Sequence, residues 1–168
     1  MMNTLLLGSL NINGGRDAYK REIVKQMHLQ KRLDVLFLQE THSDALNEID
    51  WKMWWGGTSF LSHGTNVSGG VAILFSPTVG VCVKSTVEVV AGRALVVRAQ
   101  IQDISFVFIN VYSPTSGPDR LLFFKEISQF LEHCDPTDCI VVGGDWNCTL
   151  KPGVDRTGKE PHLAYRWH

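Results

Sequence analysis

The chain has 168 residues, which suits one domain of ordinary size and is long enough to bury a hydrophobic core. Its 16 basic and 17 acidic residues give a formal net charge of −1, which excludes a polycationic nucleic-acid binder. Hydrophobic residues make up 44% and charged residues 20%, a globular rather than a disordered composition. No apolar run reaches the roughly 18 residues needed to cross a membrane, so we expect no membrane partner.

The N-terminus and the cysteines predict a protein of a reducing compartment. The apolar stretch 4–8 follows no basic region, so no signal peptide is predicted. None of the four cysteines forms a C-x-x-C pair, which disfavours a zinc site. Cys82 and Cys139 lie in apolar, strand-like stretches and are predicted to be buried thiols. We therefore expect reduced cysteines and a nuclear or cytoplasmic location.

The first part of the chain predicts a helix between two strands. Residues 4–12 are typical of a buried strand, Asp17 can cap a helix over 18–32, and residues 34–39 form a short apolar run expected to be a central strand. The helical positions expected to face the core are Tyr19, Ile23, Met27 and Leu33. The opposite face is basic, and solvation is favoured over DNA contact for its side chains, which are Lys20, Arg21, Lys25, Lys31 and Arg32.

The rest of the chain predicts strands and one further helix. Residues 43–68 are expected to be irregular, and core packing explains their clustered tryptophans better than a stacking platform does: Trp51, Trp54 and Trp55. The predicted strands are 71–75, a meander of 81–90, 93–101 and 104–112, and finally 138–143, followed by a loop and a short tail. An amphipathic helix is predicted over 119–133, with an apolar side of Leu122, Phe123, Ile127, Phe130 and Leu131. This order predicts an α/β sandwich of mixed sheet with helices outside.

Polar residues able to do chemistry follow four of the apolar strands. They are Asn11 and Asn13, Gln39 and Glu40, Asn110 and Tyr112, and Asp145 and Asn147. Carboxylates and carboxamide oxygens suit Mg²⁺ or Mn²⁺ rather than zinc, while a carboxamide N–H or a tyrosine hydroxyl can hold a phosphate oxygen. Each residue taken singly fits an ordinary turn or strand end. Four such ends in succession favour metal-assisted attack of water on a phosphodiester or phosphomonoester.

At these residues the sequence resembles the endonuclease/exonuclease/phosphatase superfamily, and most closely the endonuclease domain of long-interspersed-element (non-LTR) retrotransposons. The resemblance follows the family's order through five segments: 9–15 (SLNINGG), 34–42 (DVLFLQETH), 69–75 (GGVAILF), 108–117 (FINVYSPTSG) and 140–150 (IVVGGDWNCTL). It implies a DNase I-like fold, a two-layer β-sandwich flanked by helices. It also implies Mg²⁺-dependent cleavage of DNA, with Mn²⁺ as an alternative ion.

The resemblance also implies a role for each residue of the site. Glu40 would be the principal metal ligand, with Asn13 and Asn11 beside the metal and hydrogen bonding to its shell or to the phosphate. Asp145 would activate the attacking water or serve the leaving group, Asn147 would hold a phosphate oxygen, and Tyr112 would contact the phosphate. Relatives that act at abasic sites carry an acidic residue where this chain has Asn13, which favours the retrotransposon branch.

The resemblance covers only the N-terminal part of such a domain. The family's second half supplies an Asp–His pair, and here no histidine lies in an Asp-His context. We therefore expect residues 1–168 to be a single domain that lacks its C-terminal part and is catalytically incomplete. The candidate partners are DNA and a reverse transcriptase domain in a longer product. Two alternatives remain: a metal-dependent phosphatase acting on phosphoinositides or small phosphate esters, and a non-catalytic fragment that folds or acts only with a partner.

Overall fold

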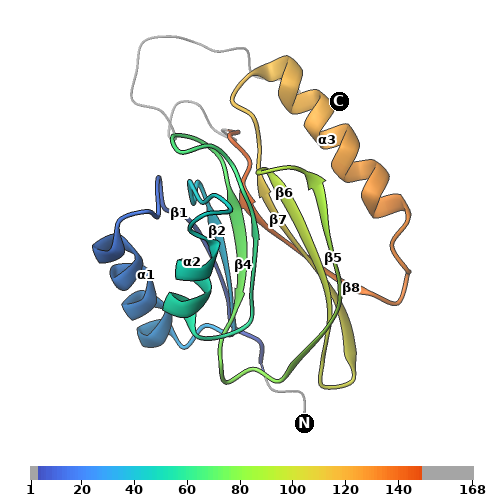
Figure 1. Cartoon of the computed structure of the whole chain (residues 1–168). Helices are drawn as coiled ribbons and strands as arrows, with labels where there is room; N and C mark the ends of the chain where they lie inside the picture. The colour runs from blue at the N-terminus through green and yellow to red at the C-terminus, as the bar shows by residue number, and fades with distance from the viewer. Residues whose placement is uncertain (1–3, 149–168) are drawn as a thin grey trace, which may run out of the picture.

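Two four-stranded sheets pack face to face in the computed structural model, which describes residues 4–148 (Figure 1). The first sheet has the order β1-β2-β4-β3 and the second the order β5-β6-β7-β8. Their strands are β1 (Leu7–Asn11), β2 (Val35–Gln39), β3 (Ser59–Ser62), β4 (Val71–Phe75), β5 (Val81–Val90), β6 (Ala94–Ile101), β7 (Ile104–Tyr112) and β8 (Cys139–Asp145). Both sheets are mixed, because β1–β2 and β7–β8 are parallel pairs and the others are antiparallel. The predicted sandwich is confirmed.

Helices cover the outer face of each sheet. Helices α1 (Ala18–Lys31) and α2 (Glu48–Trp55) pack on the first sheet, and α3 (Gly117–Glu132) packs on the second. Strands β2 and β4 are therefore buried on both faces, which explains why every residue in them is buried and why their sequences are apolar runs. Trp51 and Trp55 lie in the core between α2 and the first sheet, which confirms that they are packing residues.

Asn110 crosses the interface between the two sheets and is fully buried. From β7, its Nδ2 atom donates to the carbonyl oxygens of Leu38 and Ala72, each at 2.8 Å. Its Oδ1 atom accepts a hydrogen bond from Nε2 of Gln39 at 2.7 Å. The sequence placed Asn110 and Gln39 among the chemically active strand ends. The structure corrects this prediction, because both side chains form hydrogen bonds that join the two sheets.

Residues 43–68 were predicted to be irregular. This prediction was wrong, because the segment contains α2 and β3. Helix α2 begins after a turn in which the Asp44 carboxylate accepts hydrogen bonds from the backbone N–H groups of Leu46 and Asn47. Strand β3 is short and pairs only with β4, at the edge of the sheet. A two-turn helix with three tryptophans and a four-residue edge strand offer too few periods for their patterns to stand out.

Several predicted facings were wrong. Helix α1 buries Val24 and His28, whereas Tyr19 and Ile23 are exposed. Leu122 of α3 is likewise exposed, although Phe123 and Ile127 are buried as predicted. The thiols predicted to be buried, Cys82 and Cys139, are exposed, and each lies on an outermost strand of the second sheet, which is hydrogen bonded to a strand on one side only.

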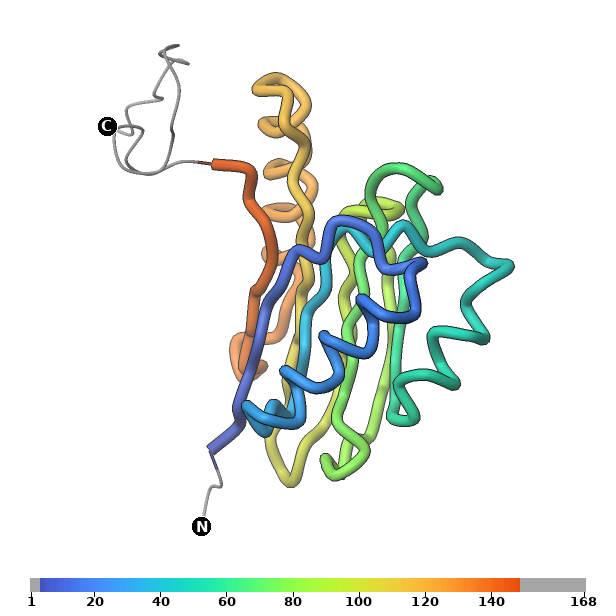
Figure 2. The backbone as a smooth tube through the Cα atoms, turned by 90° about the vertical axis from the view of Figure 1, so that its left-hand side faces the viewer, coloured from blue at the N-terminus to red at the C-terminus, as the bar shows by residue number. Residues whose placement is uncertain are grey.

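The parallel strands β1 and β8 are the terminal strands of different sheets and run side by side (Figure 2). Their register partners are β2 and β7, with Asn11 opposite Gln39 and Asp145 opposite Tyr112. The C-terminal ends of β1, β2, β7 and β8 therefore meet at one end of the sandwich. The predicted loop and tail beyond residue 148 lie outside the described residues. No helix within residues 4–148 is long and apolar enough to cross a membrane.

Candidate active site

Asn11 joins two carboxylates that come from different sheets. Its Nδ2 atom donates to Oε1 of Glu40 at 2.8 Å and to Oδ2 of Asp145 at 2.9 Å. Its Oδ1 atom accepts a hydrogen bond from the backbone N–H of Asn13 at 3.0 Å, which fixes the orientation of the amide. Glu40 follows β2 and Asp145 ends β8, so the three side chains lie within one hydrogen-bonded group although 134 residues separate Asn11 from Asp145.

Tyr112 completes this group from the end of β7. Burial and then the hydrogen bond and negative charge of Glu40 raise the pKa of the Tyr112 phenol, with a further contribution from Asp145 that the Arg93 charge opposes. The hydroxyl is protonated at neutral pH, as in any tyrosine, and can donate a hydrogen bond. Arg93 packs its guanidinium 5.1 Å from the centre of the tyrosine ring and donates from Nη1 to the Tyr112 carbonyl at 3.2 Å.

Both oxygens of the Asp145 carboxylate are held. Oδ2 accepts from Asn11, and Oδ1 accepts from the backbone N–H of Asn147 at 2.9 Å. Asn147 is tied in turn: its Nδ2 atom donates to the Ser113 carbonyl at 2.6 Å, and its own carbonyl accepts from Arg120 Nη1 at 2.8 Å. Within residues 4–148, one amide hydrogen and the Oδ1 atom of Asn147 have no hydrogen-bond partner, since the amide carries two donors and an acceptor.

The two glycines before Asp145 let β8 approach its neighbours closely. A Cβ atom on Gly143 would lie 3.0 Å from the Phe37 ring of the other sheet. A Cβ atom on Gly144 would meet the carbonyl oxygen of Val111, and this glycine also has a φ of +146°. Larger residues would push β8 away and move Asp145, so the Gly-Gly-Asp sequence belongs to the construction of the site.

Four residues around the carboxylates adopt the left-handed backbone region that L-residues disfavour. Their φ angles are 43° for Asn13, 52° for Glu40, 51° for His42 and 48° for Asn147. Such conformations cost roughly 1–2 kcal/mol each and persist where the surroundings enforce them. Here backbone hydrogen bonds do so: the Glu40 carbonyl accepts from the Gly14 N–H at 2.7 Å, and the His42 N–H donates to the Gly69 carbonyl at 3.1 Å. Backbone strain is thus concentrated at the predicted site.

The structure brings together five of the six predicted site residues: Asn11, Glu40, Tyr112, Asp145 and Asn147. Asn13 contributes its backbone, while its side chain takes part in no hydrogen bond found within residues 4–148. Its role as a metal ligand stays a prediction.

Two residues at the site were not predicted. His42 Nε2 lies 3.6 Å from Glu40 Oε2. Its position two residues after Glu40 is the sequence signal for this contact, although His42 lies in no Asp-His pair. Arg93 lies in the β5–β6 turn and is followed by no polar motif, so nothing local marks it.

The donor set suits a hard divalent cation held by few protein ligands. Among residues 4–148, no group of three or more His, Cys, Asp or Glu side chains is placed to hold a metal ion, so a closed zinc-type site is not built there. Asp145 is committed to hydrogen bonds, whereas the Glu40 carboxylate has further accepting positions. One carboxylate completed by water and substrate oxygens is an arrangement that Mg²⁺ accepts. The residues therefore fit the predicted ion.

A DNase I-like sandwich with a paired-carboxylate site at the ends of its strands defines a class of phosphoester-cleaving proteins. The model of the endonuclease/exonuclease/phosphatase family matches residues 8–166, and the chain belongs to this family. This identification confirms the resemblance inferred from the five sequence segments.

The chain is similar in sequence to one transposon protein and similar in fold to several solved structures. The chain is 37% identical over 146 residues to the transposon TX1 uncharacterized 149 kDa protein of Xenopus laevis, covering 87% of this chain and 11% of that protein. The fold of the chain is similar to that of D. rerio TDP2 complexed with single strand DNA product, with a TM-score of 0.67 and 13% identity. The match covers 89% of this chain and 63% of the TDP2 chain. The endonuclease domain of TRAS1, a telomere-specific non-LTR retrotransposon, gives a TM-score of 0.62, 14% identity and coverage of 84% and 60%.

Proposed function

We propose that this chain carries the carboxylate half of a Mg²⁺-dependent DNA endonuclease site of the retrotransposon type. The observation that carries the proposal is the Asn11 amide, which hydrogen bonds to Glu40 of one sheet and Asp145 of the other. Membership of the family supports phosphodiester hydrolysis as the reaction. A transposon relative and a retrotransposon endonuclease domain among the similar structures support DNA as the substrate.

Each side chain has a role that its contacts support. Asp145, held by Asn11 and by the Asn147 N–H, accepts the proton of the attacking water. Tyr112, a protonated phenol at neutral pH, donates a hydrogen bond to a phosphoryl oxygen, and the amide hydrogen of Asn147 that does not bond to Ser113 does the same. Glu40, with Asn13 beside it, would hold Mg²⁺ or Mn²⁺. The bound ion would supply Lewis-acid stabilisation of the charge that builds on the phosphate.

The chain spans about a tenth of its transposon relative and under two thirds of the similar solved structures. We propose that the complete activity needs further groups from a longer product, with a reverse transcriptase domain as the partner suggested by the transposon relative. Losing a group that stabilises transition-state charge costs roughly a hundredfold or more in rate. The isolated chain should therefore act slowly.

The proposal is tested by incubating the chain with supercoiled plasmid and Mg²⁺, beside a sample containing EDTA. Slow, EDTA-sensitive conversion to open circles supports the proposal. No conversion by a cooperatively folded chain, even at enzyme excess, would refute autonomous nuclease activity. Hydrolysis of phosphoinositides in place of plasmid would transfer the same site to a phosphatase.

Glu40→Gln is expected to raise the Mg²⁺ concentration for half-maximal nicking at least tenfold and to leave the thermal midpoint almost unchanged. The amide keeps the shape and can still accept from Asn11, but it lacks the charge that attracts a divalent cation. Titrating Mg²⁺ in the nicking assay and melting both proteins measures the two effects. Asp103→Asn, on the β6–β7 turn, is the matched loss of one carboxylate. Unfolding of the Glu40→Gln protein would show that Glu40 is structural.

A further inference from the structure

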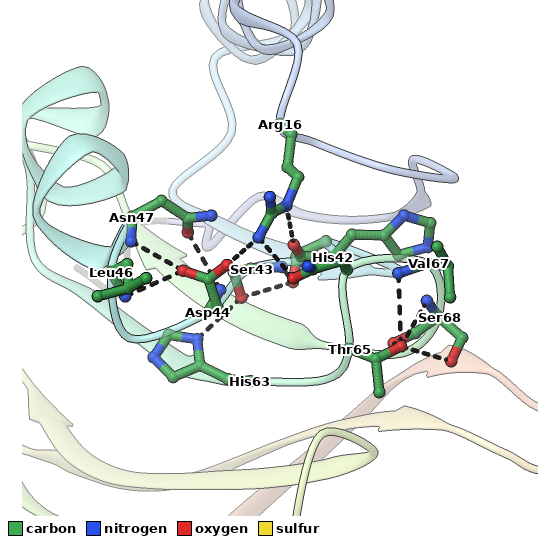
Figure 3. Close-up of polar contacts among 12 residues, drawn as sticks. Arg16, His42, Ser43, Asp44, Leu46, Asn47, His63, Thr65, Val67 and Ser68 are labelled. Carbon is green, nitrogen blue, oxygen red and sulfur yellow. Dashed lines mark hydrogen bonds and ion pairs between the residues drawn. The ribbon is translucent and has the colours of Figure 1, made fainter.

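Three loops, one of which begins with Glu40, meet at Arg16. Figure 3 shows the polar contacts around this arginine. The loops are residues 12–17, which follow β1, residues 40–47, which follow β2, and residues 63–70, which join β3 to β4. Arg16, from the first loop, forms an ion pair with the Asp44 carboxylate of the second. Its Nη2 atom also donates to Asn66 Oδ1 of the third loop at 2.7 Å, and its Nε atom donates to the His42 carbonyl at 3.0 Å.

The groups that Arg16 joins are already ordered by their own contacts. Asp44 accepts two backbone N–H groups at the start of α2, at 2.9 and 3.0 Å. Asn66 lies in a turn closed by Thr65, whose N–H donates to the Ser68 carbonyl at 2.7 Å and whose hydroxyl accepts from the Ser68 N–H at 3.0 Å. Arg16 therefore connects loops whose local turns are already held by their own hydrogen bonds.

The connection leads directly to the candidate metal ligand. His42 lies two residues after Glu40, and both have left-handed backbones that their surroundings must maintain. On the other side, the first loop donates from Gly14 N to the Glu40 carbonyl and from Gly15 N to the Thr41 carbonyl. Arg16 is the next residue of this loop, and its side chain adds a further contact by donating to the carbonyl of His42, two residues after Glu40.

We propose that Arg16 is a positioning residue that fixes the three loops and thereby the orientation of Glu40. Its consequence for catalysis rests on the proposed function, whereas its consequence for loop order does not. The arginine side chain suits this task because its planar guanidinium offers several donors in fixed directions, while lysine offers a single compact charge. Its head group is part-exposed, so the ion pair adds little to global stability, and its effect is local.

Hydrogen–deuterium exchange of the full chain tests the loop connection without any assay of activity. Arg16→Ala is expected to speed amide exchange at least fivefold in residues 40–47 and 63–70, and to leave β5–β7 unchanged. Asn66→Ala removes one arm and should speed exchange in residues 63–70 alone. Arg98→Ala, which breaks the ion pair with Asp138 on the second sheet, is the matched control and should leave both loops unchanged. Equal exchange in the wild type and Arg16→Ala would overturn the proposal.

The nicking assay separates positioning from simple loss of folded protein. Arg16→Ala is expected to raise the Mg²⁺ concentration for half-maximal nicking about tenfold with little change in the KM for plasmid, because a displaced Glu40 binds the ion less well. Arg16→Lys should recover part of this loss. A lower maximal rate at unchanged Mg²⁺ dependence would overturn the positioning role. Absence of nicking by the wild type would refute autonomous nuclease activity of this chain, and the exchange experiment would still decide the loop connection.

Discussion

Asp145→Ala is expected to lower the rate of Mg²⁺-dependent plasmid nicking by about a thousandfold, which would bring this slow activity to background. A positioned general base contributes roughly 10²–10⁴ in rate. Asp145 is such a group because Asn11 and the Asn147 N–H hold its two oxygens, so its orientation is set before substrate arrives. The measurement is the single-turnover rate with enzyme in excess, which removes differences in DNA affinity and product release.

The controls for this experiment separate charge from folding. Asp138→Ala removes a carboxylate that pairs with Arg98 just before β8 and should leave the nicking rate within about twofold. Asp145→Asn is expected to be as inactive as Asp145→Ala. Whichever way its amide is turned, the new NH₂ group would face an N–H donor, either that of Asn11 or that of Asn147. Nicking by Asp145→Ala at more than a tenth of the wild-type rate would show that another group accepts the proton.

The layers of the fold could be predicted because burial imposes a clear pattern of apolar residues on the sequence. Strands β2 and β4 are covered on both faces and read as unbroken apolar runs, and the meander β5–β7 has short turns. The facing of α1 could not be predicted by spacing alone: Tyr19 and Ile23 follow a helical period as well as Val24 and His28 do. Which stripe is buried depends on where the helix lands on the sheet, which is a tertiary property.

The residues that make up the site could be predicted, but how deep each lies between the sheets could not. Asn11, Glu40 and Asp145 were found because each ends or directly follows an apolar strand. Asn110 and Tyr112 are two residues apart on β7 and share a face, yet Tyr112 reaches Glu40 whereas Asn110 lies one step deeper between the sheets. A period of two gives the face of a strand residue and says nothing about its distance from the rim. The Arg16 contacts depend on loop geometry and leave no local signal.

Asn110→Ala is expected to lower the free energy of unfolding by about 3 kcal/mol. The change removes the donor to the Leu38 and Ala72 carbonyls and the acceptor for Gln39, all inside the sandwich. Each buried polar group left without its partner costs roughly 1–3 kcal/mol, and the space vacated by the amide adds a cavity cost. Thermal and urea unfolding should both report the loss, with the thermal midpoint falling by roughly 10 °C.

The matched control for Asn110→Ala lies on the same strand. Ser105→Ala also shortens a polar side chain of β7, but Ser105 is exposed and its loss should change stability by less than about 0.5 kcal/mol. Asn110→Asp is expected to be at least as damaging as the alanine variant. One of its oxygens would face the two carbonyls, and a charge would be buried between the sheets without a cation. Stability of Asn110→Ala within 1 kcal/mol of the wild type would mean that the sheets hold together through their apolar faces alone, and that the amide serves another purpose.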